Sequence, residues 1–180
     1  MKVIIQNARL AFPSLFTADE KFGNYGGQFL VEPDSKAVAK MEAAIEQVAK
    51  EKWGAKAEAT LKGIRAKNNI CMYSGDLKAD YDGFEGMVAI SAGNPKRPTV
   101  VDRAKNPTTE SDGLVYAGCY VNVILDVWAQ DNEWGKRINA KLLGVQFFKD
   151  GDSFGSGATV SEDDFDDLSA EDEDDASDFT

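Results

Sequence analysis

The sequence contains no histidine, which is the side chain that most often acts as a general base, activates a nucleophile or binds a metal. Neither of the glycine-rich phosphate-binding patterns, GxxxxGK[ST] and GxGxxG, is present. The sequence therefore disfavours an enzyme and predicts no cofactor. Metal chemistry with carboxylates alone is the catalytic alternative, a nuclease using Asp76, Asp80 and Asp82, but acids in such a Gly- and Tyr-containing loop are more often ordinary loop polarity.

Cysteine is scarce, and long apolar runs are absent. Cys71 and Cys119 stand far apart without a CxxC pattern, so we expect two reduced thiols in the core. No run of 18 apolar residues occurs, which predicts that the chain does not span a membrane. The N-terminal MKVIIQNARL lacks a small-residue cleavage site and is interpreted as a strand and not as a signal peptide.

Residues 150–180 lack Lys and Arg altogether and carry thirteen of the chain's 31 acids. Eighteen acids remain in residues 1–149 against all 20 basic residues, so the net charge of that part is about +2. A run of like charges buries too little apolar surface to offset its ordering entropy. The sequence predicts one domain, residues 1–149, followed by a disordered acidic tail, residues 150–180.

A tethered polyanion stays at roughly millimolar effective concentration near any basic groove of its own chain. The tail can thus compete with an anionic ligand, and a simple solubility tail is the alternative. Aromatic residues among the acids favour specific docking, so we predict that Phe165, Phe179 and Asp178 bind a partner.

Alternating apolar residues predict a mainly β chain. Several predicted strands with one main helix favour an OB-fold-like small antiparallel barrel with an inserted helix at about 35–53, because no regular strand–helix repeat exists. The predicted strands are residues 2–10, 28–32, 87–92, 99–101, 114–130 and 136–148, and a second short helix follows at 56–62.

Rings and cations gather in several places, and this combination suits single-stranded nucleic acid because rings stack bases and cations meet phosphates. The first candidate patch is on the long hairpin. Tyr116 and Tyr120, four residues apart on one strand, would lie on the same face as Arg137, Asn139 and Lys141 of the partner strand. The full set of candidate DNA-binding residues comprises Tyr116, Tyr120, Arg137, Asn139 and Lys141 on the hairpin, Trp134 and Lys136 at its tip, Tyr73, Tyr81, Arg65 and Lys67 with Lys78 in the irregular segment, and Lys96 and Arg97 between two prolines.

The chain resembles the single-stranded DNA-binding proteins of tailed bacteriophages. The resemblance is carried by VIIQNARLAFPSLF (Val3–Phe16), YAGCYVNVILDVWAQDN (Tyr116–Asn132) and KLLGVQFFKDG (Lys141–Gly151), followed by the acidic tail. It implies an OB-fold barrel with an extra helix. It also implies a tail that occludes the DNA groove and recruits replication proteins, and a location in the cytoplasm of the infected bacterial host. Phe179 would be the docking aromatic, although here Thr180 follows it.

The leading hypothesis is therefore a non-catalytic protein that binds single-stranded DNA with little sequence preference, in phage DNA replication, recombination or repair. The alternative is a protein-interaction adaptor whose tail mimics DNA and which binds no DNA itself. The sequence leaves the oligomeric state open, with a homodimer among the alternatives.

Overall fold

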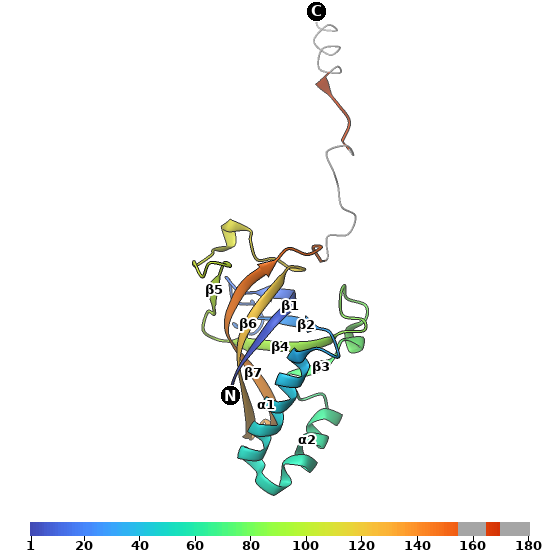
Figure 1. Ribbon diagram of the computed structural model, residues 1–180, viewed down its shortest axis with the longest axis vertical. Coiled ribbons are helices and arrows are strands. Elements are labelled where there is room, and N and C mark those ends of the chain that lie inside the picture. The colour runs from blue at the N-terminus through green and yellow to red at the C-terminus, as the bar shows by residue number, and fades with distance from the viewer. Residues whose placement is uncertain (155–164, 170–180) are drawn as a thin grey trace, which may run out of the picture.

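A computed structural model describes residues 1–154 and 165–169 (Figure 1). The predictions for the rest of the tail, including its disorder and the roles of Asp178 and Phe179, concern residues outside this description. The chain forms a β-barrel with two helices at one end. Its elements are β1 (Lys2–Ser14), β2 (Tyr25–Val31), α1 (Lys36–Trp53), α2 (Ala57–Ala66), β3 (Met72–Ser74), β4 (Val88–Asn94), β5 (Thr99–Val101), β6 (Tyr120–Asn132) and β7 (Gly135–Lys149), with short 3-10 turns at Gly54–Lys56, Gly75–Lys78 and Glu110–Asp112.

Five strands close the barrel in the order β1-β2-β4-β7-β6, and β6 returns to β1. The closing contact is parallel and brief, with Gly93 of β4 paired to Lys141 of β7. Asn94 next to it is buried and donates from Nδ2 to the Leu142 carbonyl at 3.0 Å, which satisfies a backbone acceptor at the seam. The predicted mainly β, OB-fold-like barrel is confirmed.

β1 serves two partners because it bends. Its first half pairs with β6 and its second half with β2, and the register shifts between Ile5 and Ala8 and again between Ala11 and Ser14. Asn7 and Phe12 take positive φ values of 57° and 48° at these irregularities. Bulges of this kind increase strand curvature, and a small barrel needs that curvature to close.

The β6–β7 hairpin is the longest pairing, and a bulge divides its second strand. Ile124 pairs with Gly144 but Leu125 pairs with Leu142, so Leu143 is the extra residue, beside the glycine where a bulge was expected. The prediction that this hairpin begins at residue 114 is wrong, since β6 begins at Tyr120. The alternation of apolar residues continues through 114–119, but within the described part of the chain only Gly118 and Cys119 of these residues are seen to exchange backbone hydrogen bonds with a strand, at Leu10 of β1.

The predicted main helix is confirmed as α1, which packs Met41, Ile45 and Val48 against the barrel core. Gly54 ends it with φ 55°, a backbone conformation that glycine adopts without strain. The second helix, α2, ends at Ala66, four residues beyond the predicted end. β3, in the segment expected to be irregular, is an unpredicted strand. No helix of the described residues is both long and apolar enough to cross a bilayer.

The core fills the barrel and extends under α1, and both cysteines lie in it as free thiols. Burial raises the pKa of the Cys71 thiol to about 12 and also raises the pKa of Cys119. These thiols therefore remain protonated, and their burial as free thiols matches the prediction of two reduced thiols in the core.

Replacing Phe29 by alanine is expected to lower the free energy of unfolding by about 3–5 kcal/mol, because the ring is fully buried in the core and its removal leaves a cavity. Urea denaturation followed by circular dichroism measures the change. Phe22→Ala is the matched control, since that ring is 70% exposed, and a change within about 0.5 kcal/mol is expected there. Equal losses in the two variants would contradict the assignment of Phe29 to the core.

Candidate nucleic-acid interface

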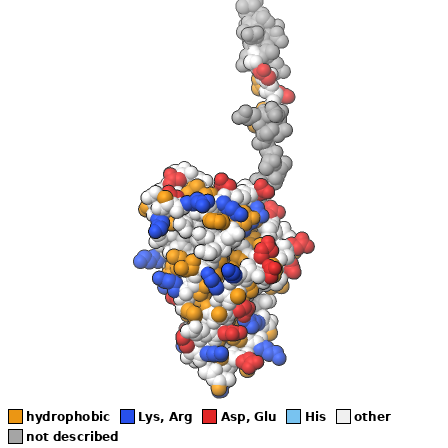
Figure 2. All heavy atoms as spheres, in the orientation of Figure 1, with side chains coloured by type: hydrophobic (Ala, Val, Ile, Leu, Met, Phe, Trp, Pro, Cys, Tyr) orange, Lys and Arg blue, Asp and Glu red, His pale blue; other side chains and the backbone are white. Residues whose placement is uncertain are grey.

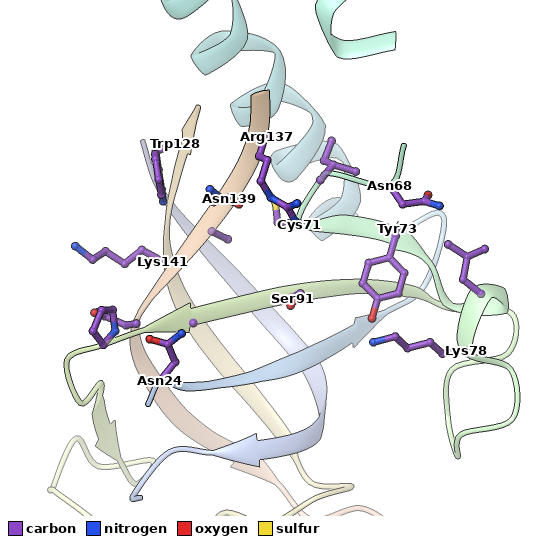
Figure 3. Close-up of a pocket in the computed structure, with 16 residues that line it drawn as sticks. Asn24, Asn68, Cys71, Tyr73, Lys78, Ser91, Trp128, Arg137, Asn139 and Lys141 are labelled. Atoms are coloured by element: carbon purple, nitrogen blue, oxygen red, sulfur yellow. The ribbon is translucent and has the colours of Figure 1, made fainter. Parts of the chain in front are cut away.

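One open groove of about 640 Å³ crosses the barrel wall where β4 meets β7, and Figure 3 shows the side chains around it. We call it the cationic groove. Four segments that are distant in sequence form it: the β1–β2 loop, the segment from the end of α2 through β3 to Lys78, the strand β4 with Pro95 after it, and the β6–β7 hairpin. Its lining residues are Asn24, Asn68, Ile70, Cys71, Tyr73, Leu77, Lys78, Ser91, Gly93, Asn94, Pro95, Trp128, Arg137, Asn139, Ala140 and Lys141.

The charges of this groove have one sign. Lys78 lies on one side, and Arg137 and Lys141 lie on the other (Figure 3). No Asp or Glu is found among its described lining residues. Cations in a groove whose lining contains no acid create a positive potential that attracts phosphates.

Two aromatic rings, Tyr73 and Trp128, stand on opposite sides of the groove (Figure 3). The Tyr73 hydroxyl donates to Gln28 Oε1 at 2.6 Å, and the Lys78 ammonium lies 5.3 Å from the centre of its ring. Trp128 is 43% exposed, so much of its indole remains accessible. Tyr73 is therefore held in place at its hydroxyl end, and both rings can offer a face to a flat ligand.

Hydrogen bonds orient the polar side chains of the β7 wall. Arg137 donates from Nη1 to Asn69 Oδ1 at 3.0 Å, and Asn139 donates from Nδ2 to Gln130 Oε1 at 3.0 Å. Arg137 and Lys141 face the same side as Asn139 because residues two apart on a strand point the same way. The Arg137 guanidinium uses one of its N–H donors on Asn69, so its other N–H groups can bind a phosphate.

The structure brings together residues from two patches that the sequence could not relate. Tyr73 and Lys78 of the irregular segment share this groove with Arg137, Asn139 and Lys141 of the hairpin. The other eleven lining residues were not among the candidates, and they include Asn24 and a further aromatic residue, Trp128. Trp128 could have been found, since its position in the alternation places it on the outer face of β6, and its pairing with Asn139 brings it to the groove.

The predicted geometry of the first patch is wrong. Tyr116 precedes β6, and Tyr120, the first residue of β6, pairs with Lys149 and not with Arg137 or Lys141. Trp128 is the β6 residue that lies opposite Asn139. Tyr120 is eight residues from Trp128, or about 27 Å along the strand, so neither tyrosine lines the cationic groove.

The two tyrosines instead contact the base of the acidic tail. The Tyr116 hydroxyl donates to Asp150 Oδ1 at 2.9 Å and accepts from the Gly151 amide at 3.1 Å. Burial raises the pKa of Tyr116, so it keeps the proton that it donates. The Lys149 ammonium lies 4.6 Å from the centre of the Tyr120 ring.

Arg9 and Phe154 continue this attachment. Arg9 donates to the carbonyls of Gly118 and Asp152 at 3.0 and 2.7 Å, and its guanidinium lies 4.1 Å from the centre of the Phe154 ring. Phe154 also donates its amide to the Ala117 carbonyl at 3.0 Å. The chain thus remains bonded to the barrel through residue 154, five residues beyond the predicted domain boundary.

The remaining candidates lie outside the groove. Arg65 forms an ion pair with Glu42 between the helices at 2.7 Å, and Arg97 donates to the Phe16 carbonyl at 2.6 Å. Tyr81 packs its edge against Phe12, with ring centres 5.0 Å apart. The other four are surface residues: Lys67, Lys96, Trp134 and Lys136, of which Trp134, at the tip of the hairpin, is 81% exposed.

The three acids weighed as a metal site lie in the loop between β3 and β4. Asp76 accepts the Gly86 amide at 2.8 Å and so helps to close the loop between β3 and β4. Asp80 and Asp82 line an apolar pocket with Phe12 and Tyr81. Across residues 1–154 and 165–169, no three Cys, Asp or Glu side chains gather closely enough to hold a metal ion.

The chain is similar in sequence to a known protein family and to a known phage protein. A family model described as "Enterobacter phage Enc34, ssDNA-binding protein" matches residues 1–177. Putative protein p50 of Acyrthosiphon pisum secondary endosymbiont phage 1 is 42% identical over 181 residues, covering 96% of this chain and 97% of that protein.

Two solved structures share the fold. The single-stranded DNA-binding protein of bacteriophage Enc34 in complex with ssDNA matches with a TM-score of 0.72 and 27% identity, over 86% of this chain and 89% of that one. The single-stranded DNA-binding protein gp2.5 of bacteriophage T7 matches with a TM-score of 0.56 and 14% identity, over 91% and 93%, which shows a common fold alone. Because the family model covers nearly the whole sequence, the chain belongs to the Enc34 ssDNA-binding protein family of bacteriophages.

Proposed function

We propose that this protein binds single-stranded DNA in the cationic groove, without catalysis and with little sequence preference. The observation that carries the proposal is the joint placement of Tyr73 and Trp128 with Lys78, Arg137 and Lys141 in one groove. The related Enc34 protein, whose structure is of a complex with ssDNA, supports the same ligand.

The position of the groove on the barrel also supports this ligand. OB-folds bind oligonucleotides on the face of their second and third strands, between the loop joining strands 1 and 2 and the loop joining strands 4 and 5. In this barrel, Asn24 comes from the β1–β2 loop, Ser91 from the third barrel strand β4, and Trp128 from the β6–β7 hairpin. The cationic groove therefore occupies the usual oligonucleotide-binding region of the fold.

Bases would stack on Tyr73 and Trp128, at about 1–3 kcal/mol for each base, while the cations meet phosphates. Stacking requires a flat base and not a particular base edge, so the sequence preference should be weak. The bases of a duplex are paired and stacked on one another, so they cannot stack on Tyr73 or Trp128 unless the strands separate. Single-stranded DNA should therefore bind more tightly than duplex DNA.

The acidic tail would compete for this groove and be displaced when DNA binds. The negative charge of the tail is complementary to the positive charge of the groove. The 26 residues after Phe154 span up to about 86–94 Å when extended, which is enough for the acids to reach the groove. Phe165, Phe179 and Asp178 would engage phage or host replication proteins once the tail is released. The protein would thereby serve phage DNA replication, recombination or repair in the cytoplasm of the infected host.

A titration of fluorescein-labelled oligonucleotides tests the ligand. We expect fluorescence anisotropy to report tight binding of a mixed-sequence single strand and weaker binding of the matching duplex, with an RNA of the same sequence as a third probe. Absence of binding by the full chain and by a chain ending at Phe154 would contradict the proposal and favour an adaptor whose tail mimics DNA.

Replacing Arg137 and Lys141 by glutamine should lower the salt dependence of binding. Each lost phosphate contact reduces the slope of log K against log[salt] by about 0.7 for a single strand, so the double variant should lose about 1.4. Affinities measured between 50 and 300 mM NaCl give the slope. Lys50→Gln with Lys62→Gln is the matched control, because both residues lie on the helices outside the groove, and an equal loss of slope there would argue for a diffuse surface.

A further inference from the structure

A second groove, of about 530 Å³, lies on the outer face of the barrel formed by β1, β6, β7 and β5. We call it the Ile4–Ile124 groove. It shares no lining residue with the cationic groove, so the two are separate surfaces. It is lined by Lys2, Ile4, Thr99, Val101, Lys105, Asn122, Ile124, Leu143, Gly144, Val145 and Gln146.

This groove is apolar at its centre and basic at its edge. Ile4 and Ile124 are 48% and 37% exposed, and they pair with each other across β1 and β6, so their exposed side chains are neighbours. Lys2 and Lys105 supply the charges, and no acid is found among its described lining residues. Contiguous exposed apolar side chains with a charged edge are typical of a surface that binds a peptide. Hydrophobic and basic side chains are interspersed on the barrel face seen in Figure 2.

The tail contains a segment with the complementary pattern. Phe165 and Leu168 are exposed apolar residues, 73% and 58%, and they are separated by two acids, Asp166 and Asp167. Hydrogen bonds from Ser169 lower the pKa of Asp167, so this carboxylate is ionised at neutral pH. Two apolar side chains and two carboxylates in four residues match a groove with an apolar floor and lysines at its edge.

The base of the tail is fixed within reach of this groove. Arg9, which holds Asp152 and Phe154, pairs with Tyr120, whereas Ile4 pairs with Ile124 further along the same two strands. Four or five residues along a strand correspond to about 13–17 Å. The eleven residues from Phe154 to Phe165 span at most about 36–40 Å, which is more than this separation.

The outer face of β6 connects the two places. Tyr120, beside the tail base, and Ile124, in the groove, point outward with Asn122 between them, while Val121 and Val123 point into the core. Lys149 over Tyr120 adds a further cation along this path. A tail that runs from Phe154 toward the groove along this face would therefore pass Lys149.

We propose that the Phe165–Leu168 segment docks in the Ile4–Ile124 groove of its own chain, with its two apolar side chains on the isoleucines and its carboxylates near Lys2 and Lys105. This docking site lies apart from the cationic groove and does not depend on DNA binding. It would hold the first acidic cluster of the tail on the barrel, so that the acidic residues after Ser169 reach the cationic groove, and Phe165 becomes available to a replication protein only when it leaves the Ile4–Ile124 groove.

A nitroxide label at Ser169→Cys tests the docking in the full-length protein. The native Cys71 and Cys119 are buried, so the label reacts at the introduced cysteine alone. In a ¹⁵N-labelled protein we expect the amide signals of Ile4 and Ile124 to lose about half of their intensity or more, because a segment on a short tether is present at millimolar effective concentration. Reduction of the nitroxide should restore them.

Two further samples decide between the alternatives. Phe165→Ser with Leu168→Ser in the labelled chain keeps every acid, and we expect the intensity losses to disappear. A mixture of ¹⁵N-labelled wild-type protein with unlabelled spin-labelled protein should show no losses. Losses in the mixture would assign the groove to the tail of a second copy, losses confined to Trp128 and Arg137 would place the segment in the cationic groove, and uniform intensities would show no docking; each of these results overturns the proposal.

Discussion

A chain that ends at Phe154 is expected to bind single-stranded DNA roughly tenfold or more tightly than the full chain at low salt, because a tethered competitor at millimolar effective concentration has been removed. The cut keeps the contacts of Asp150, Gly151, Asp152 and Phe154 with the barrel. It removes eleven of the 31 acids, which leaves 20 acids against 20 basic residues and brings the net charge from −11 to zero. Fluorescence anisotropy with one oligonucleotide at two salt concentrations measures the change.

A full-length chain in which those eleven acids are replaced by asparagine and glutamine is the matched control. If charge causes the competition, this variant should bind as tightly as the shortened chain although its tail is still present. The advantage of both variants should shrink as salt rises, because the tail and the DNA compete through screened charges. An unchanged or weaker affinity of the shortened chain would rule out self-competition.

Replacing both Tyr73 and Trp128 by alanine is expected to lower the affinity for single-stranded DNA by about two orders of magnitude. Each ring that stacks a base contributes about 1–3 kcal/mol, which corresponds to a factor of about 5 to 150 for each variant alone. Both side chains are partly exposed, but Tyr73 also packs against the buried cluster that contains Leu30 and Phe84, so the folding of the variant is measured as well. Anisotropy titrations give the affinities, and circular dichroism confirms folding.

Two controls separate stacking from other effects. Tyr73→Phe keeps the ring and loses only the hydrogen bond to Gln28, so its affinity should stay close to that of the wild type. Tyr81→Ala removes a half-exposed ring that packs on Phe12 outside the groove, and no change is expected. A loss in Tyr81→Ala as large as in Trp128→Ala would move the binding surface to the pocket around Phe12.

Local patterns were enough to predict most of the elements. Alternation predicted β1, β2, β4 and β7, and helical spacing predicted α1, because each pattern reflects the burial of one face of a single element. The start of β6 was predicted six residues too early, since alternation shows which face is apolar but does not show whether a partner strand is present. β3 has only three residues, and this length is too short for any periodicity.

The candidate groove was predicted only in parts. Tyr73 and Arg137 were chosen because each is near other cations or rings in the sequence, but their common location depends on the segment before β3 pairing with β7 at Ile138. Tyr116 and Tyr120 are also rings near cations in the sequence, but Tyr116 precedes β6 and Tyr120 pairs with Lys149, at the end of the hairpin away from Arg137. Residue type thus suggested a ligand, whereas register decided which residues can act together.

The sequence by itself determined the separation of a mildly basic, barrel-forming part from an acidic tail, because charge and alternation are local properties of a chain. Only the tertiary structure decided which rings and cations share a groove and where the tail is attached. Barrel closure depends on pairings between residues that lie far apart in the chain, such as Gly93 with Lys141, and local patterns carry no information on such distances.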